Sequence, residues 1–210
     1  MVKFAEREAS ALEKEYIEKY LRGFESERLI MRPFRDGDEG DIYDYAKDPD
    51  VGPHAGWKPH DNIDESRSVL KMFMDTEDEL TFALVEKESG KVIGSLGLMK
   101  DFRRQGDGIL EMGYVLGKNY WGRGLMTEAA KAAIKFSFEE LGLGLLTIYH
   151  FDYNMRSKRV IEKCGFKFEG VLRSGSKIFD GRVYDSFCYS MTKEEYEKIY
   201  RSRLFHVKHL

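Results

Sequence analysis

The stretch Asn119-Tyr-Trp-Gly-Arg-Gly-Leu-Met-Thr-Glu128 decides the fold of this 210-residue chain. It follows an apolar run, Leu110–Leu116, that predicts a strand, and it precedes an alanine-rich run, Ala129–Phe136, that predicts a helix. Two glycines therefore lie in a tight turn that opens a helix. The free N–H groups and the positive dipole end of a helix attract phosphate oxygens, and glycine lets a ligand approach the backbone closely. We therefore expect a phosphate-bearing ligand at this turn.

Two common nucleotide-binding patterns do not fit the turn. A P-loop needs Gly-x4-Gly-Lys-Ser/Thr, and no such string occurs in the chain. A Rossmann fingerprint needs a third glycine three residues after the second, but position 127 is Thr. The pattern that remains is x-x-Gly-x-Gly, with the polar residue Asn119 three positions before the first glycine.

This pattern resembles the acetyl-CoA pyrophosphate loop of the GNAT acetyltransferases, although Gln or Arg is commoner there than Asn119. Further segments resemble the RimJ/RimL branch of that family, and together they cover roughly residues 24–193. These segments, in chain order, are Glu27–Phe34, Phe82–Gly97, Tyr120–Ala129, Asn154–Phe166 and Glu169–Arg173. Five ordered segments with this spacing are far more specific than a single Gly-x-Gly.

The resemblance implies an α+β (mixed α/β) GNAT fold and an acetyl-CoA-dependent N-acetyltransferase. The expected architecture is a twisted, mixed, mostly antiparallel sheet of about six or seven strands, flanked by helices. We divide the chain into an N-terminal helical extension (1–23), the acetyltransferase domain (24–193) and a C-terminal helix with a basic tail (194–210). The extension is expected to pack on its own domain, with pairing to a second subunit or contact with another partner as the alternatives.

The composition is ordinary for a soluble globular protein. Apolar residues make up 42% of the chain, charged residues 34%, and the net charge of −3 gives no case for a nucleic-acid partner. The two cysteines, Cys164 and Cys188, have no metal-ligand spacing. No apolar run is long enough to span a membrane. We therefore expect a cytoplasmic protein without a metal and without membrane attachment.

The periodicity of apolar residues, with glycine and proline positions, predicts the elements of the chain. The expected helices are 3–22, 38–47, 63–74, 127–141, 154–164 and 193–200. The expected strands are 29–33, 82–86, 91–100, 110–116, 145–151, 166–176 and 182–191, and residues 48–62 are expected to form a loop. Acids crowd residues 36–50, and we interpret them as the solvated face of a helix, with attraction of a cationic substrate as the alternative.

The resemblance also implies a set of residues that bind acetyl-CoA. The pantetheine arm is expected to pair with the backbone of Tyr114, Val115 and Leu116. Asn154 is expected to bind the same arm or to serve only as a helix N-cap. The pyrophosphate is expected at the turn, whose residues are Asn119, Trp121, Gly122, Arg123, Gly124 and Leu125.

Two residues are the catalytic candidates. Glu111 matches an acid of the RimJ/RimL branch and is expected to act as general base, with a structural hydrogen bond at a strand end as the alternative. Ser157 is expected to reach the CoA sulfur. Many GNAT enzymes use a Tyr seven residues after the Asn as general acid, but position 161 here is Ile. Ser157 or water is therefore left for the leaving thiolate, with Tyr149 and Tyr153 as nearby alternatives.

Two further residues are expected near the acceptor amine. Trp57 lies in the long loop, where it either shapes the acceptor site or packs on its own domain. Asp185 either approaches the acceptor, caps a strand pairing or binds Arg182. The acceptor is expected to be a protein N-terminal amine or a small-molecule amine, with aminoglycosides or polyamines as the first alternative. A catalytically silent CoA-binding regulatory module is the second.

Overall fold

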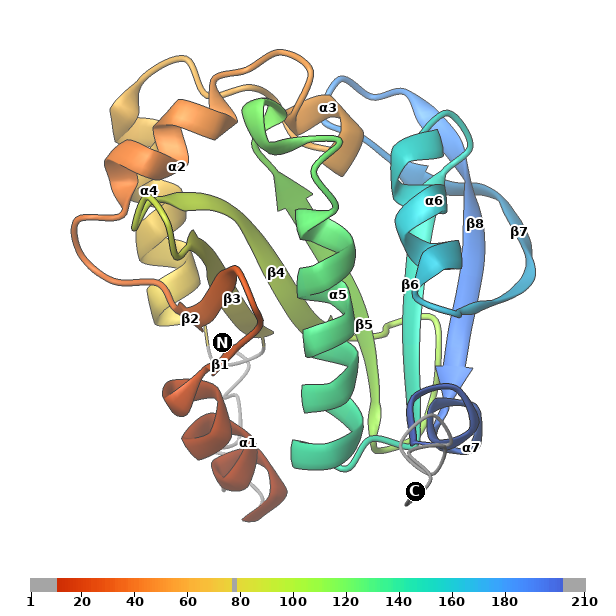
Figure 1. The fold of residues 1–210 in the computed structure, drawn as a ribbon. Coiled ribbons are helices and arrows are strands. Elements are labelled where there is room, and N and C mark those ends of the chain that lie inside the picture. The colour runs from red at the N-terminus through yellow and green to blue at the C-terminus, as the bar shows by residue number, and fades with distance from the viewer. Residues whose placement is uncertain (1–10, 77–78, 202–210) are drawn as a thin grey trace, which may run out of the picture.

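The computed structural model describes residues 11–76 and 79–201, in which one eight-stranded sheet is flanked by helices on both faces (Figure 1). The strand order is β1-β2-β3-β4-β5-β6-β8-β7, and β5 with β6 is the parallel pair of an otherwise antiparallel sheet. The strands are β1 Phe24–Glu25, β2 Leu29–Pro33, β3 Glu79–Glu86, β4 Val92–Lys100, β5 Ile109–Leu116, β6 Leu145–Phe151, β7 Lys167–Lys177 and β8 Val183–Thr192.

Most of the helices connect strands along the chain, and they pack on the faces of the sheet. The α-helices are α1 Ala11–Arg22, α2 Glu39–Ala46, α3 Gly52–Ala55, α4 Ile63–Asp75, α5 Leu125–Lys135, α6 Met155–Lys163 and α7 Lys193–Tyr196. A 3-10 turn, η1 (Lys118–Tyr120), precedes α5, and π-helical turns follow α5 and α7 at η2 (Phe136–Glu140) and η3 (Glu197–Arg201). The mixed, mostly antiparallel fold expected from the sequence is confirmed.

The side chains of the central strands alternate between two hydrophobic cores, one on each face of the sheet. Phe82 and Leu84 belong to the core that α5 covers, whereas Ala83 and Val85 belong to the core that α2 and α4 cover. Successive side chains of a strand point to opposite faces, so this alternation fixes the register of the sheet. The α5 core takes small residues at Ala129, Ala130 and Ala133, which are fully buried and let the helix approach the sheet closely.

Side-chain caps begin two of the helices that border the site. The Asn62 side chain accepts hydrogen bonds from the backbone N–H groups of Asp64 and Glu65 at the start of α4. The Asn154 side chain accepts one from Ser157 N–H at the start of α6. These bonds satisfy N–H groups that lack partners within the helix, so both helix starts are fixed locally by the sequence.

The sequence-based boundaries need four corrections. β3 begins at Glu79, three residues before the strand expected over 82–86. Residues 48–62 are not wholly a loop, because Gly52–Ala55 forms α3, with proline in its first turn and Gly56 in the left-handed region after it. The short strand β1 was not expected, and it brings the sheet to eight strands rather than about six or seven. The helix expected over 127–141 begins at Leu125 and changes to a π-helical turn at Phe136.

The N-terminal helix packs on its own domain. The Tyr20 hydroxyl donates to the Thr81 carbonyl at 2.8 Å, and its ring meets Phe82 edge-on at 4.9 Å between centroids. The part of the expected helix that precedes Ala11 lies outside the described residues. Within residues 11–76 and 79–201, no helix is long and apolar enough to cross a membrane.

Candidate active site

The glycine turn has the backbone geometry of an anion-binding site. Gly122 and Gly124 have φ angles of 75° and 77°, in the left-handed region that side chains other than glycine rarely adopt. A Cβ added at Gly122 would meet nothing within 4 Å, so this position is open to a ligand. The first turn of α5 follows at Leu125, and a cavity of about 270 Å³ lies against it. The positive end of the helix dipole therefore faces open space.

The side chains of the turn differ in whether they line this cavity or contact other parts of the protein. Trp121 lines the cavity and donates its indole N–H to the Leu116 carbonyl at 2.7 Å. Arg123 forms an ion pair with Glu86 at 2.7 Å, and Asn119 is exposed in η1; neither lines this cavity. Neither the Asn119 nor the Arg123 side chain therefore lies at this cavity.

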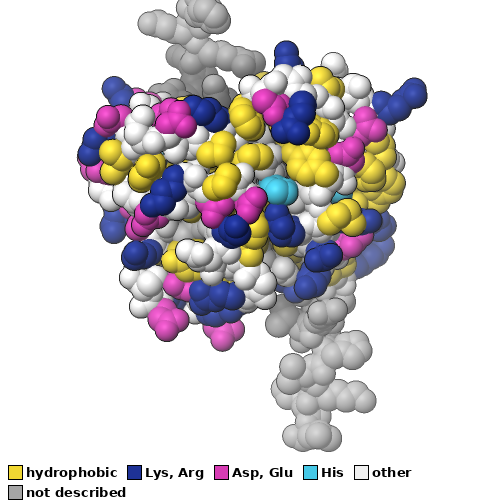
Figure 2. Space-filling view, turned by 90° about the horizontal axis from the view of Figure 1, so that it is seen from above, with side chains coloured by type: hydrophobic (Ala, Val, Ile, Leu, Met, Phe, Trp, Pro, Cys, Tyr) yellow, Lys and Arg dark blue, Asp and Glu magenta, His cyan; other side chains and the backbone are white. Residues whose placement is uncertain are grey.

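Basic side chains of α6 complete the phosphate end of the cavity. Arg156, Arg159 and Lys163 all line it, and the Arg156 guanidinium lies 4.1 Å from the centroid of the Trp121 ring. The face seen in Figure 2 carries Lys and Arg side chains beside hydrophobic groups and a histidine. Sequence reasoning missed these three residues, although their spacing of three and four positions would have placed them on one side of a helix.

Strands β5 and β6 separate beside this cavity. Their parallel pairing joins Ile109 to Leu145 and Leu110 to Leu146, and within the described strands it ends at Glu111 with Thr147. The remainder of β5 pairs only with β4, so the edge of Met112–Leu116 that faces β6 has no strand partner. Buried backbone groups require partners, so this edge is suited to pair with an amide-containing ligand.

A second cavity of about 530 Å³ adjoins the first. The two cavities share the lining residues His54, Ala55, Tyr114, Val115, Asn154 and Ser157. Glu111, Trp57 and Tyr149 line the second cavity only. The expected phosphate turn, pantetheine strand and catalytic candidates therefore line two adjoining cavities.

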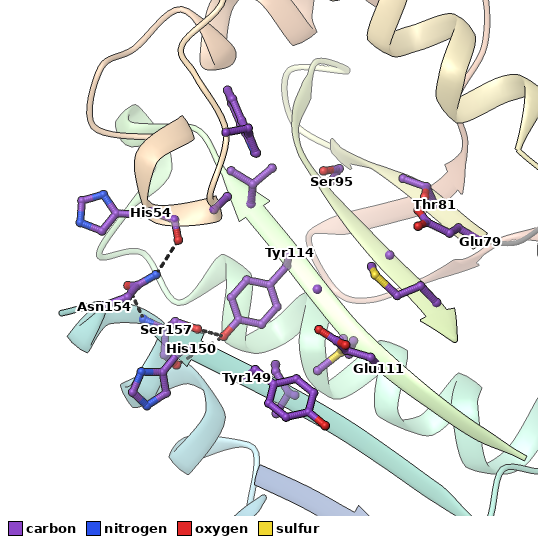
Figure 3. A pocket seen from close by; sticks show the side chains of 18 of the residues that line it. His54, Glu79, Thr81, Ser95, Glu111, Tyr114, Tyr149, His150, Asn154 and Ser157 are labelled. Atoms are coloured by element: carbon purple, nitrogen blue, oxygen red, sulfur yellow. Dashed lines mark hydrogen bonds between the residues drawn. The ribbon is translucent and has the colours of Figure 1, made fainter. Parts of the chain in front are cut away.

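A tyrosine hydroxyl lies where the two cavities meet. The Tyr114 hydroxyl is 3.0 Å from the Ser157 hydroxyl, and it donates to the Ser157 carbonyl at 3.3 Å (Figure 3). Burial raises the pKa of Tyr114 well above its ordinary value, so this hydroxyl keeps its proton at neutral pH. The resemblance implied that the Tyr114 backbone binds the pantetheine arm. It did not imply the side-chain contact, because Ser157 lies 43 positions further along the chain.

Glu111 has the electrostatics of a general base. Its side chain is 21% exposed, and burial raises its pKa to about 7, against the opposing effect of Arg103. The Arg103 guanidinium lies 3.1 Å from the carboxylate, and Asp101 and Glu79 add to the upward shift. A carboxylate with a pKa near neutrality can both accept and release a proton under physiological conditions.

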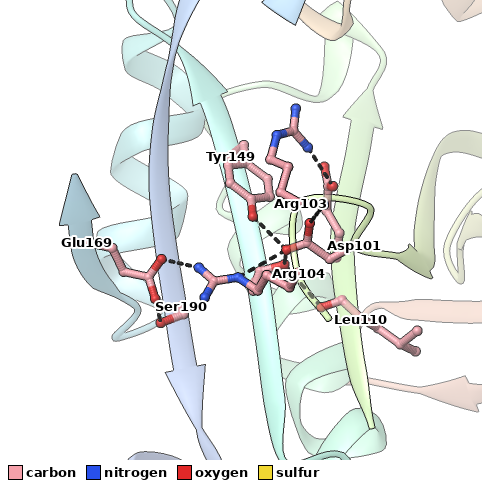
Figure 4. A network of polar contacts seen from close by, with 9 residues as sticks. Asp101, Arg103, Arg104, Leu110, Tyr149, Glu169 and Ser190 are labelled. Carbon is pink, nitrogen blue, oxygen red and sulfur yellow. Dashed lines mark hydrogen bonds and ion pairs between the residues drawn. The ribbon is translucent and has the colours of Figure 1, made fainter. Parts of the chain in front are cut away.

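A buried network holds Arg103 beside Glu111 (Figure 4). The Asp101 carboxylate is fully buried and accepts hydrogen bonds from the hydroxyls of Thr147 at 2.8 Å and Tyr149 at 2.6 Å. The same carboxylate accepts the Arg103 backbone N–H at 2.9 Å and pairs with Arg104 at 3.2 Å. The network therefore fixes the loop after β4, and Arg103 then lies 4.3 Å from the centroid of the Tyr149 ring.

The two residues expected near the acceptor have different surroundings. Trp57 lines the larger cavity, with its ring 5.4 Å from that of His60. Asp185 lines neither cavity, and its carboxylate accepts the Ser174 N–H at 2.8 Å across the β7–β8 pair. The structure therefore favours the alternative interpretation of Asp185, in which it caps a strand pairing.

The fold, the glycine turn and the two cavities beside it together indicate which class of protein this chain belongs to. The family model described as "Acetyltransferase (GNAT) domain" matches residues 28–167, and this chain belongs to that family. It is an acetyltransferase that uses acetyl-CoA, as the resemblance implied. Among the described residues, no group of three or more His, Cys, Asp or Glu is placed to hold a metal ion.

Individual relatives agree with this assignment. A Bacillus licheniformis protein named "Uncharacterized N-acetyltransferase p20" is 30% identical over 174 residues, which cover 81% of this chain and 96% of the relative. A GNAT-family acetyltransferase structure from Bacillus anthracis is 25% identical, with a TM-score of 0.73 over 82% of this chain and 99% of that chain. The ribosomal-protein-S5-alanine acetyltransferase from Vibrio fischeri shares the fold at 22% identity, with a TM-score of 0.68 over 82% of this chain and 97% of that chain.

Proposed function

We propose that this enzyme transfers the acetyl group of acetyl-CoA directly to a primary amine within a ternary complex. The acceptor amine belongs to a protein N-terminus or to a small molecule. One observation carries the proposal: β5 and β6 stop pairing at Glu111 and Thr147, beside a cavity that continues to the glycine turn. This opening lets a thioester that lies along β5 meet an amine beside Glu111.

The two substrates occupy opposite faces of the sheet in this proposal. Tyr114 points toward Ser157 on α6, whereas Glu111, three residues earlier, points to the other face because side chains alternate along a strand. The unpaired edge of β5 holds the pantetheine amides, with Asn154 beside them. The N–H groups of Gly122–Leu125 and the basic side chains of α6 hold the phosphates, since the Trp121 N–H already donates to the Lys118 carbonyl.

Glu111 acts as the general base. An alkylammonium must lose a proton before its nitrogen can attack, and Glu111 accepts that proton directly or through a water molecule. The nitrogen then forms a bond to the thioester carbonyl carbon, and the carbon–sulfur bond breaks. Because the Glu111 carboxylate has a pKa near 7, it can release the proton to solvent after each turnover.

The Tyr114–Ser157 pair supplies the proton for the leaving thiolate. The Tyr114 hydroxyl or the Ser157 hydroxyl donates it to the CoA sulfur, and the proton lost from the tetrahedral nitrogen restores the donor. The products are an N-acetyl amide and CoA thiol, with one proton released per ammonium consumed. Ser157 was expected to act at the sulfur from the sequence, and Tyr114 replaces the family tyrosine that is absent at Ile161.

Initial-velocity kinetics test this proposal. Free-thiol release is measured while acetyl-CoA and an amine are varied together, and mass spectrometry checks for an N-acetyl product. Intersecting double-reciprocal lines are expected, because both substrates must be bound before transfer. Parallel lines would indicate an acetyl-enzyme and contradict direct transfer. Acetyl-CoA binding without thiol release, across proteins, polyamines, aminoglycosides and simple amines, would favour the silent binding module.

A further inference from the structure

The strand register builds a specific surface on the Glu111 face of the sheet. Glu79 pairs with Met99 and Met99 with Glu111, so these three residues form one row across β3, β4 and β5. Two residues further along each strand, the next row is Thr81, Gly97 and Gly113. All six residues line the larger cavity, and we name the space over these two rows the acceptor chamber.

The floor of the acceptor chamber is apolar and adaptable. A Cβ added at Gly97 would lie 3.1 Å from the Met99 terminal methyl, and one added at Gly113 would lie 3.3 Å from it. The Met99 side chain therefore lies across the space that the two glycines leave open. Methionine is flexible and polarizable, so it can move to fit an apolar group placed on this floor.

The walls of the chamber are mainly aromatic and aliphatic. Val69, Met72 and Phe73 of α4 line the cavity on one side. Tyr45 of α2 is buried and also lines the cavity. Burial of apolar surface against such walls contributes about 25 cal/mol per Å², which favours an acceptor with an apolar body.

The α3 segment is tied across the cavity to the opposite side of the site. The Phe179 N–H, in the β7–β8 turn, donates to the Gly56 carbonyl at 3.1 Å. The Tyr153 hydroxyl donates to the Pro53 carbonyl at 2.8 Å, and the Asn154 side-chain amide donates to the His54 carbonyl at 3.0 Å (Figure 3). A bulky acceptor would have to break these hydrogen bonds to enter from this side, whereas a compact one would not.

The carboxylates of the chamber lie in one row, where the Arg103 guanidinium, which also lines the cavity, pairs with Glu111. Glu79 and Glu111 lie at that row, and the adjacent row, about 7 Å further along the strands, offers Thr81 and two glycines. A single ammonium group is stabilised beside the carboxylates. A second ammonium placed among the aromatic walls would lose its water without gaining a counter-charge, which is costly.

We propose that the acceptor is a compact primary monoamine with an apolar, aryl- or alkyl-sized body, which enters the acceptor chamber whole. The inference rests on the proposed function and narrows its substrate class: Glu79 and Glu111 receive the ammonium group, and the Gly97–Gly113 floor receives the body. A peptide N-terminus and a polyamine are poor fits to this chamber.

A substrate panel tests the inference directly. Thiol release is measured at saturating acetyl-CoA with 2-phenylethylamine, hexylamine, spermidine and a hexapeptide with a free N-terminus. The kcat/KM for the two apolar monoamines should exceed that for the other two by at least about ten-fold, the effect of roughly 1.4 kcal/mol of apolar contact. Faster turnover of spermidine or of the peptide would overturn the inference and leave the proposed transfer chemistry standing.

Two variants test the chamber itself. Gly97→Ala should raise the KM for 2-phenylethylamine about ten-fold without changing the Kd for acetyl-CoA, because the new methyl group fills part of the floor and pushes Met99 into the chamber. Gly40→Ala is the control, since a Cβ there meets nothing within 4 Å. Met99→Ala should improve turnover of the longer 4-phenylbutylamine relative to 2-phenylethylamine. An unchanged ranking of amines in both variants would contradict the assigned floor.

Calorimetry separates failure of the inference from failure of the chemistry. The CoA complex of the wild-type protein is titrated with 2-phenylethylamine and with spermidine. Tighter binding of 2-phenylethylamine without thiol release would support the acceptor chamber and count against the transfer function. Tighter binding of spermidine, or no binding of 2-phenylethylamine, would overturn the inference whatever the turnover.

Discussion

Glu111 illustrates how a single side chain acquires its chemistry from its surroundings. Its ionised form loses hydration on burial, which raises its pKa, and Arg103 limits that rise to a value of about 7. The sequence identified Glu111 by resemblance. It did not show Arg103, Glu79 or Asp101 beside it, because those neighbours come from strand register and from the folding of a loop.

Replacing Glu111 tests its role as base. Glu111→Gln should lower kcat/KM by about 100-fold at pH 8, the lower end of the usual contribution of a general base. The wild-type kcat/KM should rise with pH through about 7, since the carboxylate must be deprotonated to accept a proton, and the variant should lose this step. The measurement is a pH–rate profile, with the exposed Glu88→Gln as the matched control. An unchanged profile would remove Glu111 from the mechanism.

Tyr114 gives a second prediction at the same scale. Tyr114→Phe keeps the ring but removes the hydroxyl that is hydrogen-bonded to Ser157, so kcat should fall about ten- to 100-fold. The Kd for acetyl-CoA, measured by calorimetry, should stay within a factor of about two, since backbone groups carry the pantetheine contacts. Tyr43→Phe, on the surface of α2, is the control. Full activity in Tyr114→Phe would assign the sulfur proton to Ser157 or water.

At the scale of elements, the site depends on how strands and helices end. β5 and β6 diverge after Glu111, α5 begins at a left-handed glycine, and α6 begins at the Asn154 cap. The sequence predicted these three elements because their glycine and asparagine signals are local. It did not predict α3, because proline and glycine favour a loop and the hydrogen bonds that hold α3 in place come from distant residues.

The basic face of α6 provides a test of phosphate binding. The double variant Arg156→Ala, Arg159→Ala should weaken acetyl-CoA binding by at least about ten-fold at low salt, because two charges that line the phosphate end are lost. The loss should shrink as ionic strength rises, since salt screens exposed charges. The double variant Lys135→Ala, Lys158→Ala removes equal charge away from this lining and serves as control. Equal weakening by both pairs would indicate a non-specific charge effect.

At the scale of the whole molecule, the proposed function treats the sheet as a partition between the two substrates. In that proposal acetyl-CoA lies on the α6 face, the amine lies on the α2–α4 face, and they meet where β5 and β6 separate. The class of fold could be predicted from the sequence, since five motifs occur in order. The acceptor chamber could not, because Glu79, Met99 and Glu111 are neighbours only through the pairing of three strands.

The Asp101 network links both sides of this opening, and its loss should destabilise the whole domain. Asp101→Ala leaves the Thr147 and Tyr149 hydroxyls and Arg104 without their buried acceptor. The free energy of unfolding should fall by about 2–4 kcal/mol, as expected when buried polar groups lose a charged partner. Urea unfolding measures this, with the exposed Asp107→Ala as control. A change below about 0.5 kcal/mol would show that the network is not structurally important.

The most direct test of the central claim is a crystal structure with a non-reactive thioether analogue of acetyl-CoA. We predict that the pantetheine amides will pair with the open edge of Met112–Leu116, and that the pyrophosphate will accept hydrogen bonds from the N–H groups of Gly122–Leu125. The acetyl group should then point through the gap between β5 and β6 toward Glu111. An acetyl group that stays on the α6 face, away from Glu111, would contradict the account.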